Sequence, residues 1–153
     1  MAPVAGSAID QWASDATASS EYGNDSWSAG QATGAPDTTS YGDYSTAWAP
    51  DVLDGGIEWI ELTYDVAVIP ERVTVWETSG NGFVTLIEAW DDASGGWLTL
   101  WQGADDSPAA VHGFSPPLEP TEAATRRVRI SVDTAVEGWN EVDAVELSGA
   151  TPG

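Results

Sequence analysis

The acidic side chains are the residues of this sequence that could do chemistry, because they include 25 Asp and Glu among 153 residues. Two carboxyl groups hydrolyse a glycosidic bond when one has a raised pKa and they lie roughly 5 to 10 Å apart. So many carboxylates form such pairs by chance. Glu77, on the same face of its predicted strand as Val73 and Val75, is the one that merits a test. We expect it to pair with an Arg instead.

Other catalytic groups are scarce. His112 is the single histidine, it precedes Gly113 in a weak strand, and no nucleophile motif accompanies it. The absence of cysteine excludes disulfides and thiolate-bound zinc or iron–sulfur clusters. No glycine-rich phosphate loop precedes a helix. The sequence therefore predicts a domain that is not an enzyme.

The charge of the chain limits its partners. Four Arg, no Lys and 25 acidic residues give a net charge of −21. Nucleic acid and anionic membranes need cations, and the one cluster is Arg126, Arg127 and Arg129, two of which share a strand face. We therefore expect no nucleic-acid binding. The surplus suits a bound metal, a basic partner or a high-salt environment, and charge alone does not rank these three.

Membrane and export signals are missing from the sequence. No apolar run approaches the ~20 residues of a membrane span, and the N-terminus lacks the regions of a signal peptide. We expect no membrane insertion and interpret the start as the trimmed beginning of one module from a larger secreted protein.

Short runs rich in Val, Ile, Thr and Trp, separated by turn residues, predict an all-β sandwich or barrel. We expect one domain over residues 1–153, with tails at 1–8 and 150–153. The Gly- and Ser-rich segment 19–56 predicts a long loop that is functional or ordered by a metal. Ile69-Pro70 and residues 79–82 predict hairpin or bulge connections. Strands are predicted at Gln11–Ala18, Ile57–Asp65, Glu71–Thr78, Gly82–Asp91, Gly96–Gln102, Val111–Phe114, Thr125–Asp133 and Glu141–Ser148.

Alternation along two strands predicts their buried faces. Apolar residues in the strand 125–133 alternate with Arg127 and Arg129, which should face outward. Glu141 and Asp143 fall on the same face as the core residues Val145 and Leu147. Buried carboxylates are costly, so this pair needs a cation, an Arg or several N–H donors.

The nine tryptophans exceed what one small core absorbs. Trp97 and Trp101 alternate with Leu98 and Leu100, which predicts that the two indoles share one sheet face. Such a pair could form a flat surface that grips a polysaccharide chain. Core filling and cover of the sheet is the interpretation that we favour.

Four segments carry a family resemblance. ATASSEY at 16–22, WSAGQATGAPD at 27–37, GDYSTAW at 42–48 and GWNEVDAVEL at 138–147 resemble the galactose-binding-like superfamily, which includes discoidin (coagulation factor 5/8 type C) domains and many carbohydrate-binding modules. The resemblance covers nearly the whole chain. It implies a jelly-roll β-sandwich of about eight antiparallel strands.

The resemblance also implies a structural calcium ion, held by the loop after the first strand and by the last strand. A hard cation prefers several oxygen ligands, which this loop supplies. Tyr41 stands where the family usually has the first Asp of a D-G-D motif. Capping of turns is the alternative role for Asp37 and Asp43. The matching ligand positions are Asp37, Asp43, Thr46, Glu141 and Asp143.

The implied function is glycan binding by loops at one edge of the sandwich, where aromatic rings stack on sugars. Packing under the loops is the alternative for Trp27, Trp48 and Trp139. We expect a calcium-stabilised module, extracellular or at the cell surface, that binds a glycan or cell-surface polysaccharide; the alternative is a protein-interaction or structural spacer domain. The candidate ligand-binding residues are Tyr22, Trp27, Tyr44, Asn81, Trp139 and Asn140, with Tyr41 beside them.

Overall fold

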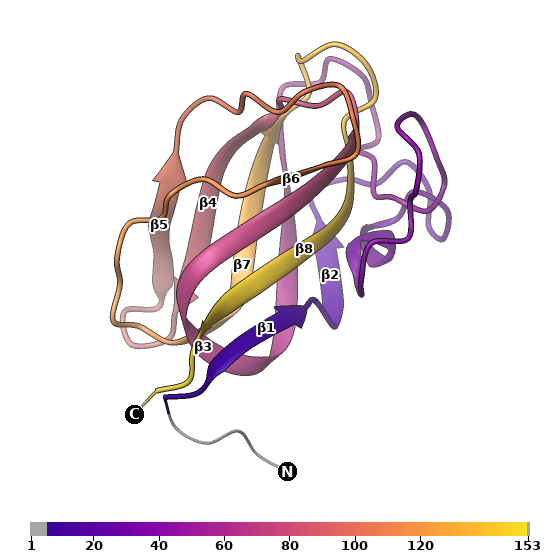
Figure 1. The fold of residues 1–153 in the computed structure, drawn as a ribbon. Helices are drawn as coiled ribbons and strands as arrows, with labels where there is room; N and C mark the ends of the chain where they lie inside the picture. The colour runs from indigo at the N-terminus through magenta and orange to yellow at the C-terminus, as the bar shows by residue number, and fades with distance from the viewer. Residues whose placement is uncertain (1–5, 153) are drawn as a thin grey trace.

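Strand β3 runs from Ile57 to Ser79 and belongs to both layers of a β-sandwich (Figure 1). The structure is a computed structural model, and the described residues are 6–152. The other strands are β1 (Ala8–Trp12), β2 (Asp15–Ala18), β4 (Val84–Asp91), β5 (Gly96–Gln102), β6 (His112–Phe114), β7 (Thr125–Asp133) and β8 (Glu141–Ala150), and a 3-10 helix, η1, spans Ala29–Ala32.

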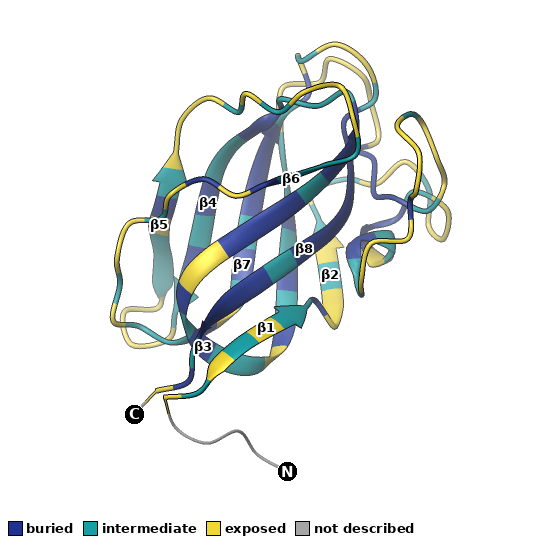
Figure 2. Ribbon diagram, in the orientation of Figure 1, coloured by how far each residue is buried: buried dark blue, intermediate teal, exposed yellow. Residues whose placement is uncertain are grey.

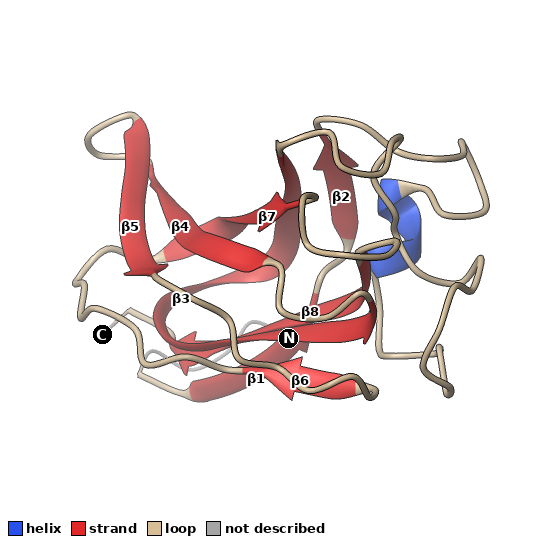
Figure 3. Cartoon of the chain, turned by 90° about the horizontal axis from the view of Figure 1, so that it is seen from above, coloured by secondary structure: helices blue, strands red, loops and turns tan. Residues whose placement is uncertain are grey.

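The two halves of β3 pair with different neighbours, and every pairing is antiparallel. The first half pairs with β2 and β7, and β7 continues through β4 to β5. The second half pairs with β6 and β8, and β1 adds to the far edge of β8. Seen from above, the two layers face each other across the core (Figure 3). The predicted all-β sandwich of about eight strands is confirmed.

The predicted break at Ile69-Pro70 is a bulge within one strand. The register of β3 shifts between Thr63 and Val68 on one side and between Pro70 and Arg72 on the other. Proline has no N–H to donate to the ladder, and the register shifts directly after the pair of Pro70 with Gly149, while the chain remains extended. The bulges let β3 bend from one layer into the other, which is why two predicted strands are one.

The first predicted strand is divided instead. Residues 8–12 pair with β8 and residues 15–18 pair with β3, so the chain changes layer between Trp12 and Asp15. The ladder also begins at Ala8 and ends at Ala150, which the sequence assigns to tails. Residues 1–5 and 153 of those tails lie outside the described part of the chain.

The core lies between the layers, and its pattern follows the predicted alternation (Figure 2). Val128, Ile130 and Val132 of β7 are fully buried, and so are Val145 and Leu147 of β8. Arg127 and Arg129 face outward, as predicted, where they contact tryptophan rings.

The predicted pairing of Trp97 with Trp101 on one face is wrong. The register between β4 and β5 shifts so that Ile87 opposes Trp101 while its neighbour Glu88 opposes Thr99. Leu100 is the extra residue, and it reverses the alternation that follows. Trp101 therefore packs edge-on against the buried Phe114 at a centroid distance of 5.2 Å.

The long segment 19–56 lies at one side of the sandwich (Figure 1). Trp48 anchors this segment. The backbone of Trp48 exchanges two hydrogen bonds, 2.8 and 3.0 Å long, with the backbone of Val142 at the start of β8. The indole is fully buried and donates to the carbonyl of Ser20. Trp48 thus packs under the loops, and it fixes them beside the first residues of β8.

Candidate ligand-binding pocket

Backbone hydrogen bonds within segment 19–56 bring three distant positions together. The Tyr22 N–H donates to the carbonyl of Ala49, and the Ala49 N–H donates to the carbonyl of Trp27. The Trp27 N–H in turn donates to the carbonyl of Ser45. These contacts place the side chains of Tyr22 and Trp27 on the same side of the loop, facing the turn that precedes β8.

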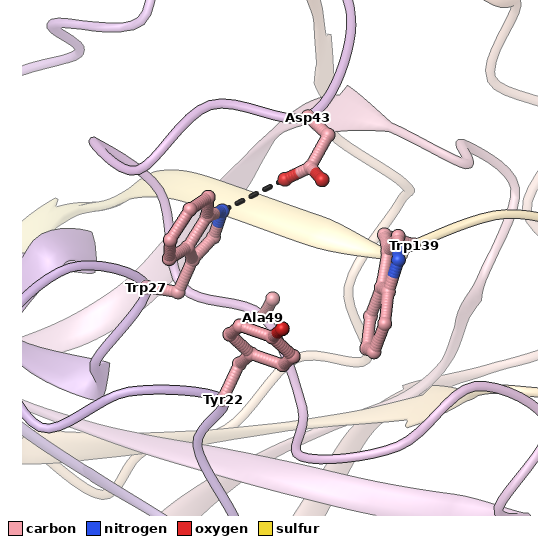
Figure 4. Close-up of a pocket in the computed structure, with 5 residues that line it drawn as sticks. All are labelled: Tyr22, Trp27, Asp43, Ala49 and Trp139. Atoms are coloured by element: carbon pink, nitrogen blue, oxygen red, sulfur yellow. Dashed lines mark hydrogen bonds between the residues drawn. The ribbon is translucent and has the colours of Figure 1, made fainter.

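Three aromatic rings and one carboxylate line a small pocket at this place (Figure 4). The ring of Tyr22 lies 5.4 Å from that of Trp27 and 5.1 Å from that of Trp139, with interplanar angles of 78° and 73°. The cavity measures about 60 Å³. We call this the aromatic pocket, and its lining residues are Tyr22, Trp27, Asp43, Ala49 and Trp139.

Trp27 is held in a conformation that an aromatic residue rarely adopts. Its φ of 57° lies in the left-handed region, where a bulky side chain costs of order 1 to 3 kcal/mol. The indole N–H donates to Oδ1 of Asp43 at 2.8 Å, which fixes the ring at the pocket wall. Surrounding contacts thus impose strain at a residue that lines the cavity.

Trp139 reaches the pocket from a turn that packs tightly on Gly80. Gly80 has a φ of +57°, and a Cβ there would lie 2.7 Å from the carbonyl oxygen of Trp139. Asn140 is buried, and its Nδ2 donates to the carbonyls of Gly80 and Val136. The structure therefore gives Asn140 a role in holding this turn rather than a place in the pocket.

Two other predicted ligand-binding residues lie outside the pocket lining. Asn81 uses its Nδ2 to hold the carbonyls of Pro108 and Ala110, which secures the following loop. Tyr44 is exposed, and its backbone N–H donates to Glu141. Tyr22, Trp27 and Trp139 are the predicted ligand residues that come together.

Sequence reasoning did not place Asp43 and Ala49 in the pocket. The family resemblance assigns Asp43 to the metal, although its carboxylate also lines the aromatic pocket. Ala49 contributes through its place in the chain fold, which no residue pattern discloses. The run Tyr-Gly-Asp-Tyr at 41–44, which has an aspartate between two tyrosines, is the one signal that could have suggested an acidic aromatic site.

Asp143 of β8 is buried and satisfied by the loop that covers it. It accepts hydrogen bonds from the backbone N–H groups of Asp37 and Thr38, each 3.0 Å long, and from the Thr38 hydroxyl at 2.6 Å. Thr46 joins through a 2.7 Å bond between its hydroxyl and that of Thr38. Burial raises the pKa of Asp143, and the neighbouring Asp37 carboxylate adds to the rise.

Glu141 is also fully buried, and one of its oxygens has no partner. Its Oε1 accepts the N–H of Tyr44 at 3.1 Å, while Oε2 is buried without a hydrogen bond. Burial, together with the nearby Asp43 carboxylate, raises the pKa of Glu141 to about 9. A buried orphan oxygen is costly, so this site calls for a proton or a cation.

The four acidic residues among the predicted metal ligands thus form two pairs, and Thr46 contacts Thr38 beside one of them. Asp37 lies with Asp143, and Asp43 lies with Glu141. Within residues 6–152, no three His, Cys, Asp or Glu side chains form a group that could hold a metal ion by themselves. Calcium accepts hydroxyl and carbonyl oxygens as well as carboxylates, so the donor set that fits here is one of mixed oxygens.

Glu77 is a buried structural carboxyl group, and the expected Arg partner is wrong. Its side chain accepts hydrogen bonds from the Gly82 N–H and the Ser107 hydroxyl, and Asp105 lies beside it. Burial, reinforced by Asp105, raises the pKa of Glu77 to about 9. The side chain is fully buried, so a glycosidic oxygen cannot reach it.

The outward face of β4, β5 and β7 carries tryptophans that are covered by arginines. Arg127 lies 4.8 Å from the ring of Trp90, and Arg129 lies 4.4 Å from that of Trp97. The Arg129 guanidinium also pairs with Glu88 at 3.2 Å. Because guanidinium groups occupy the ring faces, this surface is a self-covering sheet face rather than an open platform for sugars.

The model of one protein family matches residues 4–152, and its description is the C-terminal SD scarf domain of pappalysin-1. The chain belongs to this family. A search of curated proteins found no significant sequence match to this chain. No helix within residues 6–152 is long and apolar enough to cross a membrane.

Solved structures show the same fold at low sequence identity, and they confirm the predicted resemblance to discoidin-like and carbohydrate-binding domains. Chitosan-binding module 1 from a chitosanase/glucanase of Paenibacillus sp. IK-5 is 17% identical, with a TM-score of 0.64 over 88% of this chain and 94% of that chain. The module CpGH89CBM32-5 of Clostridium perfringens, in complex with GalNAc-β-1,3-galactose, is 16% identical, with a TM-score of 0.66 over 89% and 94%. An F5/8 type C domain from Bacteroides fragilis is 19% identical, with a TM-score of 0.65 over 97% and 99%.

Proposed function

We propose that this SD scarf domain is a non-catalytic carbohydrate-binding module that holds its glycan at the aromatic pocket. The observation that carries the proposal is the convergence of Tyr22, Trp27 and Trp139 around one cavity at the loop end of the sandwich. Indole and phenol rings contact the C–H faces of sugars, and an adjacent carboxylate accepts hydrogen bonds. The fold shared with carbohydrate-binding modules supports this function.

The proposal includes a structural calcium ion beside the pocket. Glu141 and Asp43 would hold it, with Asp143 and Asp37 adjacent and Thr46 contributing a hydroxyl oxygen. The orphan Oε2 of Glu141 supports this assignment, since a divalent cation would give this buried oxygen the partner that it lacks. The ion would fix the loop that carries Asp43 and thereby the wall of the aromatic pocket.

We also propose that the domain acts outside the cell or at its surface, as one part of a larger protein. One similar structure is a module derived from a chitosanase/glucanase, so this fold occurs as an accessory part of an enzyme. The strongly acidic surface, with a net charge of −21, keeps such a module soluble and apart from anionic polymers.

Glycan-array screening followed by calorimetry tests the function. The domain should bind at least one glycan class, and Trp139→Ala should weaken that binding at least ~10-fold, because loss of one stacking ring costs about 1 to 3 kcal/mol. Trp97→Ala is the matched control, since Trp97 is also half-buried and packs edge-on against another tryptophan. It should leave binding unchanged.

Two results would reject this function. Equal loss in both variants, or loss in Trp97→Ala alone, would move binding to the sheet face. Absence of binding to every glycan by the folded, calcium-loaded domain would instead favour a protein-interaction or spacer domain.

A further inference from the structure

We propose that the aromatic pocket binds a positively charged ammonium group carried by the glycan. The inference rests on the proposed function, because it names the chemical class of sugar that this pocket would select. Neutral sugars and sugars whose amine is acylated would bind more weakly.

The rings form three walls of a cage. Tyr22 lies between Trp27 and Trp139 and is nearly perpendicular to both, so the two indoles flank the tyrosine (Figure 4). Aromatic faces attract cations through their quadrupole, most strongly for tryptophan, and several rings around one cavity are the arrangement that recognises quaternary ammonium groups. The shape of the pocket therefore favours a compact cation.

A carboxylate completes the cage. Asp43 lines the same cavity, and its Oδ1 already accepts the indole N–H of Trp27 at 2.8 Å. The five lining residues include no Arg, so no cation of the pocket itself competes for the rings. The net charge of −21 adds a negative field that concentrates cationic ligands around the whole domain.

The size of the cavity also favours a head group. About 60 Å³ holds a few water molecules, whereas pockets that enclose an organic ligand measure roughly 300 Å³ or more. The lining has no Asn, Gln or Arg side chain to distinguish the hydroxyl pattern of a sugar. An ammonium substituent fills the space and needs only rings and charge, while the sugar ring lies outside over the exposed face of Tyr22.

Two sources share this chemistry: the primary ammonium of an amino sugar and the quaternary ammonium of a choline-type substituent. Calorimetry on the calcium-loaded domain at mildly acidic pH separates them. One arm compares a glucosamine oligosaccharide with its N-acetylated counterpart. The other compares choline with 3,3-dimethylbutanol, which has the same shape without the charge. The cationic member of at least one pair should bind ~10-fold or more tightly than its neutral partner.

Asp43→Asn tests the charge while it keeps an oxygen acceptor for the Trp27 indole. We expect a loss of ~3- to 10-fold in affinity for the cationic ligand and little change for a neutral one. Asp92→Asn is the matched control, because the exposed Asp92 also accepts an indole N–H, that of Trp90, at 2.8 Å. It removes the same charge far from the cage and should change affinity by less than about twofold.

The ligand pairs on the unmodified domain keep the test decisive even if Asp43→Asn disturbs the calcium loop. Equal binding of the cationic and neutral members of both pairs would overturn this inference, while glycan binding that is lost in Trp139→Ala would leave the proposed function standing. Tighter binding of choline than of 3,3-dimethylbutanol, together with no binding of any glycan on the array, would overturn both the proposed function and the statement that a glycan carries the ammonium group.

Discussion

The side chain of Asn140 donates a 2.8 Å hydrogen bond to the carbonyl of Gly80, and this bond joins the turn that carries Trp139 to the end of β3. Gly80 itself is in the left-handed region, and it leaves no space for a side chain beneath that turn. The position of one pocket wall therefore depends on a glycine and an amide that do not line the pocket.

Gly80→Ala should destabilise the domain and disturb the pocket together. A Cβ would meet the Trp139 carbonyl oxygen at 2.7 Å, in addition to the cost of a positive φ. Gly95→Ala is the control, because Gly95 has a φ of +68° and open space around it. Both should lose about 1 kcal/mol from φ, and Gly80→Ala should lose roughly 1 to 3 kcal/mol more. Urea unfolding followed by tryptophan fluorescence measures this, and equal losses would contradict the packing argument.

Most of the sandwich was predictable from the sequence because apolar and polar residues alternate along half-buried strands. The alternation in β7 identified its buried and exposed faces correctly. It failed where one extra residue enters a strand, as at Leu100, or where a strand bends between layers, as at Pro70. The extra residue and the bend both depend on pairing with residues that are distant in the sequence, so the local residue pattern does not predict them.

The candidate site was predictable only in part. Tyr22, Trp27 and Trp139 are aromatic residues in loop motifs, so their type alone marks them as candidates. Nothing in their spacing says that they meet, because Trp139 is more than a hundred positions from Tyr22. Residue type was misleading for Asn81 and Asn140. Their amides bond to backbone carbonyls and hold loops in place, as polar residues in loops often do.

Calcium should raise the thermal stability of the domain relative to a chelator at fixed ionic strength. Binding to the folded state alone contributes about 2.7 kcal/mol at a hundredfold excess over Kd, which corresponds to a rise in Tm of several degrees. Glu141→Gln should abolish most of this rise, whereas the exposed Glu71→Gln should preserve it. Differential scanning calorimetry gives both numbers. An unchanged Tm for the unmodified domain would reject the calcium ion.

Arg129→Ala should destabilise the fold without affecting ligand binding. Arg129 covers Trp97 and pairs with the half-buried Glu88, so its loss exposes a ring and leaves a carboxylate unpaired. We expect a loss of about 1 to 2 kcal/mol. Arg72→Ala is the control, since Arg72 is largely exposed and its ion pairs contribute little. Chemical denaturation measures the difference, and a large drop in glycan affinity for Arg129→Ala would point to the sheet face as the binding surface.

Glu77 should make the domain less stable as pH rises from 4.5 towards 9. Its pKa is raised to about 9 in the folded state, chiefly by burial, against 4.5 when exposed, so the folded protein holds a proton that the unfolded chain releases. The contribution of Glu77 to the free energy of unfolding is therefore fully present below pH 4.5. Between pH 4.5 and about 9 this contribution decreases by at most about 1.4 kcal/mol per pH unit. Glu77→Gln mimics the protonated side chain and should remove this slope, so the variant gains stability over the unmodified domain as pH rises. Exposed Glu119→Gln should leave the slope unchanged. Urea unfolding at a series of pH values compares the three proteins, and parallel pH profiles for all of them would show that Glu77 is ionised in the folded domain.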